Sequence, residues 1–188
     1  MELLNILSAF GLSASAGLNA YIPLLVVAFT ARFTNLIKLS EPWNALTNEW
    51  VIGVLVVLSL VEFFADKIPA VNHVNDAIQT FIRPVAGAVL FAASANVITD
   101  VHPIFSLALG LLVSGGVHTV KAAAVRPAVT ATTGGAGNLP VSILEDVISA
   151  LVSLLAVIIP IAIGLFLLLV AILVLWLVYR RRERLSKA

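Results

Sequence analysis

The residues of this chain that could bind a solute occur in a short pattern that is present twice. Ser15 and Asn19 lie in GLSASAGLN, and Ser114 and His118 occupy the matching positions of GLLVSGGVH in the second half of the chain. Serine, asparagine and histidine side chains offer hydrogen-bond donors and acceptors. Self-similarity at a fixed offset in a membrane protein indicates two related halves that share a central site. The alternative is a packing face, because small residues let helices approach closely.

Three basic residues lie in and after the second copy of the pattern, at His118, Lys121 and Arg126. His118 and Lys121 are three residues apart and share one face of a helix. An ionisable residue inside a membrane segment is by default a functional candidate. These side chains could bind an anionic solute, and His118 could relay protons near neutral pH. Alternatively, Lys121 and Arg126 only mark the cytoplasmic end of their segment.

Two carboxylates, Glu62 and Asp66, lie four residues apart at the end of another apolar stretch. Carboxylates that share one helix face at the membrane suit a proton or a cation. We therefore predict that Glu62 and Asp66 carry a coupling ion or proton. Salt bridges to Lys67, Arg83 or Lys121 are an equally good explanation of the same pattern.

The composition indicates an integral membrane protein made of helices. Of its 188 residues, 61% are hydrophobic and only 11% are charged, and the mean hydropathy is +1.09. A soluble domain carries about 25% charged residues, and helices satisfy all backbone groups within the bilayer. The absence of cysteine excludes disulfides and thiolate metal sites. The start, Met1-Glu2-Leu3, has no basic region, so we expect the first apolar stretch to be retained.

Six apolar segments are expected to cross the membrane. They are residues 3–31, 51–65, 85–98, 104–125, 147–159 and 161–179. The stretch from 147 to 179 is too long for one crossing of about 30 Å, so we expect it to turn near Pro160. The first and fourth segments hold the repeated pattern at their centres. We predict that both are discontinuous helices, as in transporters that bind solute at a helix break.

The distribution of basic residues predicts the orientation. With six crossings, nine basic residues lie on one side of the membrane and only Arg32 and Lys38 on the other. Because basic residues favour the cytoplasm, both termini are expected to be cytoplasmic, in a bacterial inner membrane. Three crossings in each half would make the second half inverted relative to the first.

We expect a single membrane domain over 1–188, with the two repeats at 1–98 and 99–179 and a basic tail at 180–188. The first repeat carries an extra amphipathic stretch at 66–83, whose apolar face should lie at the cytoplasmic interface. That face comprises Val74, Ile78, Phe81 and Ile82.

A capping-box pattern, Ser142-Ile143-Leu144-Glu145, precedes the fifth apolar segment. It predicts that a helix begins at this point. Glu145 and Asp146 would then lie in the first turn and complement the positive end of the helix dipole.

Three stretches of the chain resemble a known family. They are SAGLNAYIP at 15–23, EFFADKIP at 62–69 with Ile82-Arg83-Pro84, and HTVKA at 118–122 with Arg126-Pro127, TGG at 133–135 and Glu145-Asp146. Together they resemble bacterial membrane proteins of the domain-of-unknown-function family 4126. The resemblance implies a small multi-pass membrane protein of unassigned activity, and it supplies no substrate.

The sequence thus favours a small secondary transporter or channel for a polar or charged solute. The site would lie between the first and fourth segments, with membrane lipids and a second copy of the chain as partners. No cofactor, metal or nucleic acid is expected, and signatures such as GxSxG and HExxH are missing, so we predict no enzymatic activity. Two alternatives stay open: a structural or assembly subunit, and an intramembrane enzyme for lipids that uses His118 and Glu62 as acid and base.

Overall fold

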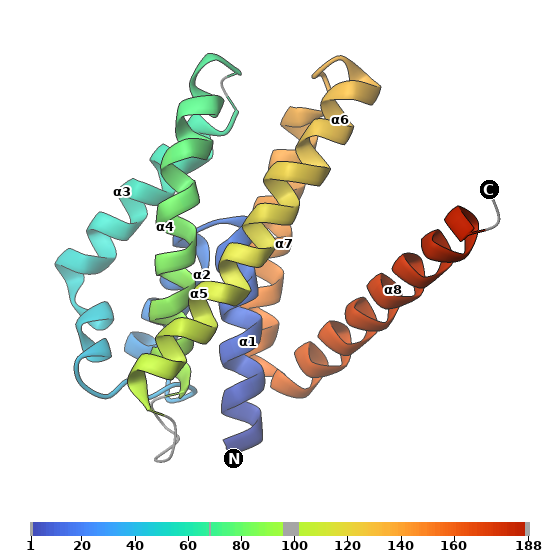
Figure 1. Cartoon of the computed structure of the whole chain (residues 1–188). Helices are drawn as coiled ribbons and strands as arrows, with labels where there is room; N and C mark the ends of the chain where they lie inside the picture. Colours follow the sequence, from blue (N-terminus) through green and yellow to red (C-terminus); the bar gives the residue numbers. More distant parts are fainter. Residues whose placement is uncertain (1, 68, 96–101, 187–188) are drawn as a thin grey trace.

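A computed structural model describes residues 2–67, 69–95 and 102–186, and its elements in these ranges are helices (Figure 1). They are α1 (Glu2–Leu18), α2 (Tyr21–Phe33), the 3-10 turn η1 (Trp43–Thr47), α3 (Glu49–Ala65), α4 (Pro69–Ala95), α5 (Pro103–Val120), the π-helical turn η2 (Lys121–Val125), α6 (Arg126–Thr133), α7 (Asn138–Ile158) and α8 (Pro160–Ser186). Three stretches are long and apolar enough to cross a membrane, at Val74–Ala95, Pro103–Thr133 and Asn138–Ile158. This agrees with the predicted all-α membrane protein.

The first apolar segment is a helical hairpin rather than one crossing. It breaks after Leu18, as the repeated pattern predicts, and α2 then runs back beside α1. Ser8 near the start of α1 and Lys38 beyond the end of α2 consequently line the same cavity. Neither helix is among the three stretches long enough to cross a membrane alone, so the predicted crossing by this segment is not confirmed.

Residues at the hairpin tip explain why the helix stops. The side-chain oxygen of Asn19 accepts hydrogen bonds from the backbone N–H groups of Tyr21 (3.1 Å) and Ile22 (3.0 Å). These are the donors that the start of a helix leaves unsatisfied. Pro23 lies in the first turn of α2, where a missing N–H has little consequence.

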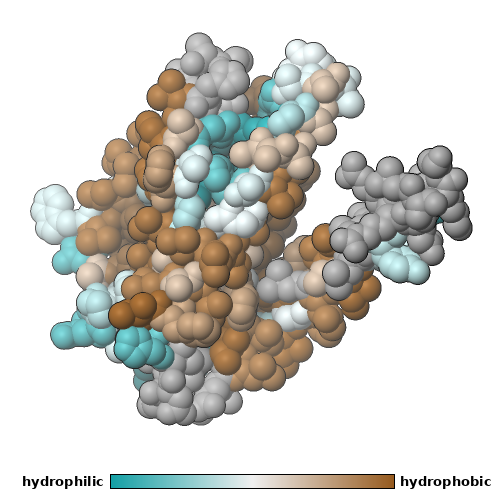
Figure 2. Space-filling view, viewed as in Figure 1, coloured by the Kyte–Doolittle hydropathy of each residue, from teal (hydrophilic) through white to brown (hydrophobic). Residues whose placement is uncertain are grey.

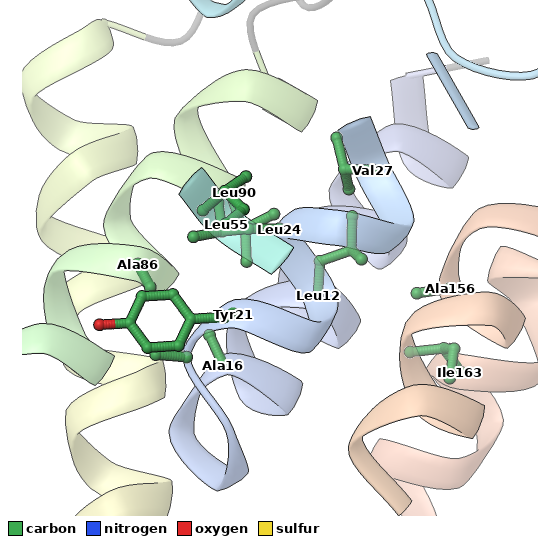
Figure 3. Packing of buried hydrophobic residues seen from close by; sticks show 11 residues of the cluster. Leu12, Ala16, Tyr21, Leu24, Val27, Leu55, Ala86, Leu90, Ala156 and Ile163 are labelled. Atoms are coloured by element: carbon green, nitrogen blue, oxygen red, sulfur yellow. The ribbon is translucent and has the colours of Figure 1, made fainter. Parts of the chain in front are cut away.

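Helix α1 is surrounded by α4, α5 and α7 at distances that only small residues allow. A Cβ atom at Gly87 of α4 would lie 2.9 Å from the Ser13 Oγ of α1, and one at Gly17 would lie 2.6 Å from the Ser114 carbonyl oxygen of α5. A Cβ atom at Gly11 would lie 2.9 Å from the Cβ of Ala156 on α7. The apolar core continues from this contact toward α2 and α3, and Leu12, Leu24 and Leu90 lie together in it (Figure 3). Small residues therefore fix the spacing of the helices around the hairpin.

The fourth segment does not break at the second copy of the pattern. Helix α5 continues through Ser114 and His118, and one π-helical turn, η2, joins it to α6. The prediction of a second discontinuous helix is wrong. A Cβ atom at Gly116 would meet nothing within 4 Å, so this glycine lies on an open face and does not interrupt the backbone hydrogen bonds.

The amphipathic stretch at 66–83 is not a separate surface insertion. From Pro69 onward it forms the first half of α4, and its polar face, with Gln79 and Arg83, is buried while Phe81 is exposed. The orientation is the reverse of that of a helix on a soluble protein, because here the apolar face can meet lipid and the polar face meets other helices.

The second half contains α7 and α8, separated at Pro160 as expected. Helix α7 begins at Asn138, one turn earlier than the capping-box pattern predicts, so Glu145 and Asp146 lie in its interior. Helix α8 diverges from the other helices (Figure 1). The expected boundary between the repeats at 98/99 and the end of the tail at 187–188 lie outside the described residues, and the inverted repeat itself is not confirmed.

Candidate functional site

The tip of the α1–α2 hairpin lies in a buried network of eight charged side chains, called the tip network below. Its members are Glu62, Asp66, Lys67, Arg83, Lys121, Arg126, Glu145 and Asp146. Each of these side chains is at most 12% exposed. Four carry negative charge and four carry positive charge, so the network is neutral as a whole.

Arg83 on α4 lies at the centre of the tip network and is fully buried. Its Nε and Nη2 atoms donate to Glu62 Oε1 at 3.2 and 2.9 Å, and Nη2 also lies 3.4 Å from Asp66 Oδ2. Ser114 donates to the Arg83 backbone carbonyl at 2.7 Å. Arg83 thus connects the end of α3 to α5 through both its side chain and its main chain.

His118 on α5 is held between two hydrogen bonds. Its Nδ1 atom lies 3.2 Å from Nη1 of Arg83, and its Nε2 atom lies 3.1 Å from the hydroxyl of Thr80. Because a guanidinium only donates, Nδ1 is the acceptor and Nε2 carries the hydrogen. The Thr80 hydroxyl accepts that hydrogen and donates to the Asp76 carbonyl at 2.8 Å. A proton on Nδ1 would face the guanidinium directly, which argues against the predicted relay through His118.

Asp66 follows the end of α3 and binds three elements at once. Its Oδ2 atom lies 3.2 Å from Nη2 of Arg126 and 3.9 Å from Nζ of Lys121, and its Oδ1 atom accepts from Asn75 at 2.6 Å. Together with the Arg83 contact, these bonds satisfy both oxygens of a carboxylate that is almost wholly buried.

Two neighbouring carboxylates of α7 complete the tip network. Glu145 Oε2 accepts from Nζ of Lys121 at 2.9 Å and from Nη2 of Arg126 at 3.1 Å. Asp146 accepts from the Asn19 amide at 3.0 Å and from Nζ of Lys67 at 2.8 Å. Helix α7 is therefore attached to the hairpin tip, to the end of α3 and to the π-helical turn.

Side chains of the tip network complement both ends of the broken helix. The Glu62 carboxylate accepts from the backbone N–H of Ala20 at 3.2 Å, next to the start of α2. The Lys121 ammonium donates to the backbone carbonyl of Leu18 at 2.9 Å, at the end of α1. A carboxylate at a helix start and an ammonium at a helix end both interact favourably with the helix dipole.

The structure brings most of the predicted site residues together, but not the two serines. Asn19, His118, Lys121, Arg126, Glu62 and Asp66 all belong to or contact the tip network. Ser15 instead bonds to Ser149 (2.9 Å) and Ser153 (2.7 Å) of α7, away from these charges. Ser114 contacts only the Arg83 backbone among the groups of the tip network. Both hydroxyls therefore join helices.

The predicted site residues leave out four members of the tip network, Lys67, Arg83, Glu145 and Asp146, although the sequence names Lys67 and Arg83 as possible salt-bridge partners of Glu62 and Asp66. The sequence pattern predicts only a helix-start role for the two α7 acids. One signal could have identified Arg83, because it follows Asn75 and Gln79 at intervals of four residues and the three share a polar face within a membrane helix.

A cavity of about 950 Å³ lies toward the opposite end of α1. Polar groups in its wall include Asn5, Ser8, Asn35 and Lys38, and Ser8 donates to the Ala156 carbonyl at 2.6 Å. The cavity therefore lies on one side of the small-residue packing around α1, and the tip network lies on the other.

Part of the tip network approaches the molecular surface between α4 and α6. Arg126 Nη1 lies 3.6 Å from the carboxylate of Asp76, which is 27% exposed. Hydrophilic atoms gather near the upper ends of these helices, between apolar flanks (Figure 2). Among the described residues, no group of three or more His, Asp or Glu side chains is placed to hold a metal ion.

Comparison with known proteins gives a family but no activity. The family model described as "Domain of unknown function (DUF4126)" matches residues 6–180. Searches among curated proteins and among solved structures return no match. The match covers almost all of the helical chain, including every residue of the tip network, and the chain therefore belongs to the DUF4126 family.

Proposed function

We propose that this protein is a small transporter or channel for a polar or charged solute, and that the tip network is its site. The observation that carries the proposal is the burial of eight balanced charges around the break between α1 and α2. A helix break of this kind exposes backbone dipoles, which transporters use to bind solutes and ions.

The energetics favour a functional origin for these charges. Burying an ion pair costs several kcal/mol per ion in desolvation, and apolar side chains of similar volume are often as stable. A purely structural contact between α3, α4 and α7 would not need four ion pairs. Ionisable groups at membrane depth are usually part of an ion or solute pathway.

Two further parts of the proposal concern orientation and assembly. The side of the molecule that holds Lys67 and Arg126 would face the cytoplasm of a bacterial inner membrane, because basic residues favour that side. The hairpin would then place the start of α1 on the opposite side, which replaces the expectation of two cytoplasmic termini, and the cavity near Ser8 and Lys38 would open there. A second copy of the chain would pack against the first to complete a pathway.

A structural role is the second candidate, and the neutrality of the tip network favours it. A network in which every positive charge has a negative partner could simply fix the hairpin between α4, α5 and α7. An enzymatic role has less support, because Glu62 and His118 both bind Arg83 and are 1% and 3% exposed.

Cysteine labelling distinguishes transport from the structural role, and the chain has no native cysteine. Single Asn19→Cys and His118→Cys variants are treated in membrane vesicles with an impermeant thiol reagent from each side. Lys38→Cys and Thr132→Cys, which replace exposed residues toward opposite ends of the molecule, report sidedness. Leu90→Cys, in the apolar core, should stay protected.

We expect reagent to reach both network positions, because a transporter opens its site to water in part of its cycle. Protection of both, with normal reaction at Lys38→Cys and Thr132→Cys, would contradict transport and favour the structural role. Reaction at Leu90→Cys as well would indicate unfolding, and the experiment would be repeated in reconstituted, purified protein.

A further inference from the structure

Lys121 occupies a position that has the chemistry of a cation site. Its ammonium is surrounded by three oxygens, the Leu18 carbonyl and Glu145 Oε2 at 2.9 Å each and Asp66 Oδ2 at 3.9 Å. The carbonyl belongs to the end of a half-helix, where the dipole is negative. Oxygen ligands of this kind, helix-end carbonyls with carboxylates, are those that replace the hydration shell of a monovalent cation in membrane proteins.

The charge balance of the tip network indicates the valence of the cation. The eight buried groups comprise four acids and four bases, and the partly exposed Asp76 also pairs with Arg126. If the Lys121 ammonium leaves its position, the site loses one positive charge. A monovalent cation replaces that charge one for one, whereas a divalent ion would add a further positive charge to a buried site.

Two buried oxygens without partners show that the surrounding helices have unused acceptor capacity. Neither the side-chain oxygen of Gln79 nor the hydroxyl of Ser142 has a hydrogen-bond partner among the described residues, and both side chains are almost fully buried. Gln79 lies on α4 between Asn75 and Arg83, which both reach Asp66, and its amide also interacts with the Tyr21 side chain at the start of α2. Ser142 lies one turn before Glu145 on the same face of α7. Buried acceptors of this kind need a donor or a cation.

The lysine at this position is also the cation best able to move. Arg83 binds two carboxylates and Arg126 binds three, each through a planar guanidinium. Lys121 carries a compact charge on a flexible four-carbon chain. Its position at the start of the π-helical turn η2 supports this, because such turns are frequent at functional sites.

From these observations we propose that Leu18, Asp66 and Glu145 form a binding site for a monovalent alkali cation, and that the Lys121 ammonium is its tethered competitor. The inference rests on the proposed transport function, in which this cation is the coupling ion. The sequence predicts Glu62 and Asp66 as the residues that bind the coupling ion, whereas the proposed site uses Asp66 and Glu145.

The test compares two lysine variants of the purified protein in detergent. Lys121→Met removes the competitor, and Lys67→Met removes the same charge from a position with one carboxylate partner and greater exposure. Unfolding temperatures are measured in sodium, potassium or choline chloride at equal concentration. We expect sodium or potassium to raise the unfolding temperature of Lys121→Met by about 4–8 °C over choline, at a concentration about thirty times Kd. Lys67→Met should show no such difference.

The double variant Lys121→Met/Glu145→Gln should lose the cation effect, because one ligand has lost its charge. If Lys121→Met does not fold, Lys121→Gln, which keeps a donor for the Leu18 carbonyl, is measured in its place. Equal unfolding temperatures in sodium, potassium and choline for the folded Lys121 variant would overturn the proposal, as would an equal cation effect in Lys67→Met.

Failure of the inference and failure of the transport proposal are distinguishable. If the Asn19→Cys and His118→Cys variants react with reagent but no lysine variant binds a cation, transport stands without this coupling site. If Lys121→Met binds the cation while both introduced cysteines stay protected, the cation site exists within a protein that does not transport.

Discussion

The two copies of the repeated pattern have different structures, although four of their positions match in type. At the first copy the helix ends and the chain turns back, whereas at the second copy the helix continues into a π-helical turn. The difference follows from the last residue of the pattern. Asn19 caps the next helix with its own side chain, while both ring nitrogens of His118 are bound to Arg83 and Thr80. A shared spacing of small residues therefore predicts close packing, and a capping side chain decides where the helix stops.

The largest effect is expected from Arg83→Met, which removes the side chain that connects His118 of the second copy to Glu62 and Asp66 beside the hairpin tip. The change leaves Glu62 and Asp66 buried without their central partner, so the free energy of unfolding should fall by about 3–5 kcal/mol. Chemical unfolding in detergent micelles, followed by circular dichroism, measures it. Arg32→Met, in the exposed pair with Glu49, is the control and should lose less than about 1 kcal/mol. Equal losses in both variants would show that the tip network does not hold the fold.

Matched glycines in the two copies should respond in opposite directions. A methyl group at Gly17 would lie 2.6 Å from the Ser114 carbonyl oxygen, so Gly17→Ala should destabilise by about 1–3 kcal/mol through overpacking. Gly116→Ala meets open space and should stabilise by about 0.5–1 kcal/mol through helix propensity. Unfolding free energies of the two variants test this directly. A larger loss of unfolding free energy in Gly116→Ala than in Gly17→Ala would contradict the proposed difference in packing between the two copies.

Removal of the Asn19 side chain should destabilise only the helix break at the first copy of the pattern. Asn19→Ala loses the cap of α2 and a partner of Asp146, for a cost of about 1–2 kcal/mol, and Asn19→Ser should recover part of it because serine also caps. Hydrogen exchange at the Tyr21 and Ile22 amides should accelerate in Asn19→Ala. Unchanged exchange at these amides would mean that tertiary contacts alone stop α1.

The smallest effects are expected at the paired serines. Ser15→Ala removes hydrogen bonds to Ser149 and Ser153, and Ser114→Ala removes one to the Arg83 carbonyl. Each should cost about 0.5–1.5 kcal/mol. Reagent access in the Asn19→Cys and His118→Cys variants should not change when either alanine is added. A change in reagent access would indicate that Ser15 and Ser114 contribute to the solute site.

Local features of the sequence predict much of the fold. Composition predicts the helical membrane protein, Asn19 with its glycine-rich surroundings marks the break, and Pro160 marks the turn between α7 and α8. No local feature tells whether the chain continues across the membrane or turns back after Asn19. That direction depends on contacts of α1 with α4, α5 and α7, which lie far along the sequence.

The site is predicted less completely, and the reason is again distance along the chain. Glu62, Asp66, His118 and Lys121 stand out because they are charged or titratable residues within or at the end of apolar segments. Their partners Arg83 and Glu145 are compatible with ordinary surface and helix-start roles when only neighbouring residues are considered. Only the packing of α4 and α7 against the hairpin shows that these charges are buried.

The placement of α1 has a consequence for biosynthesis. This helix is synthesised before α3, α4 and α7, yet its Ser15 hydroxyl bonds to Ser149 and Ser153, which are made 134 and 138 residues later. A hairpin whose tip binds charged side chains of α3, η2 and α7 cannot settle in lipid before those elements are present. The hairpin must therefore wait near the membrane surface or against the insertion machinery, and its docking is expected to be a late step of assembly.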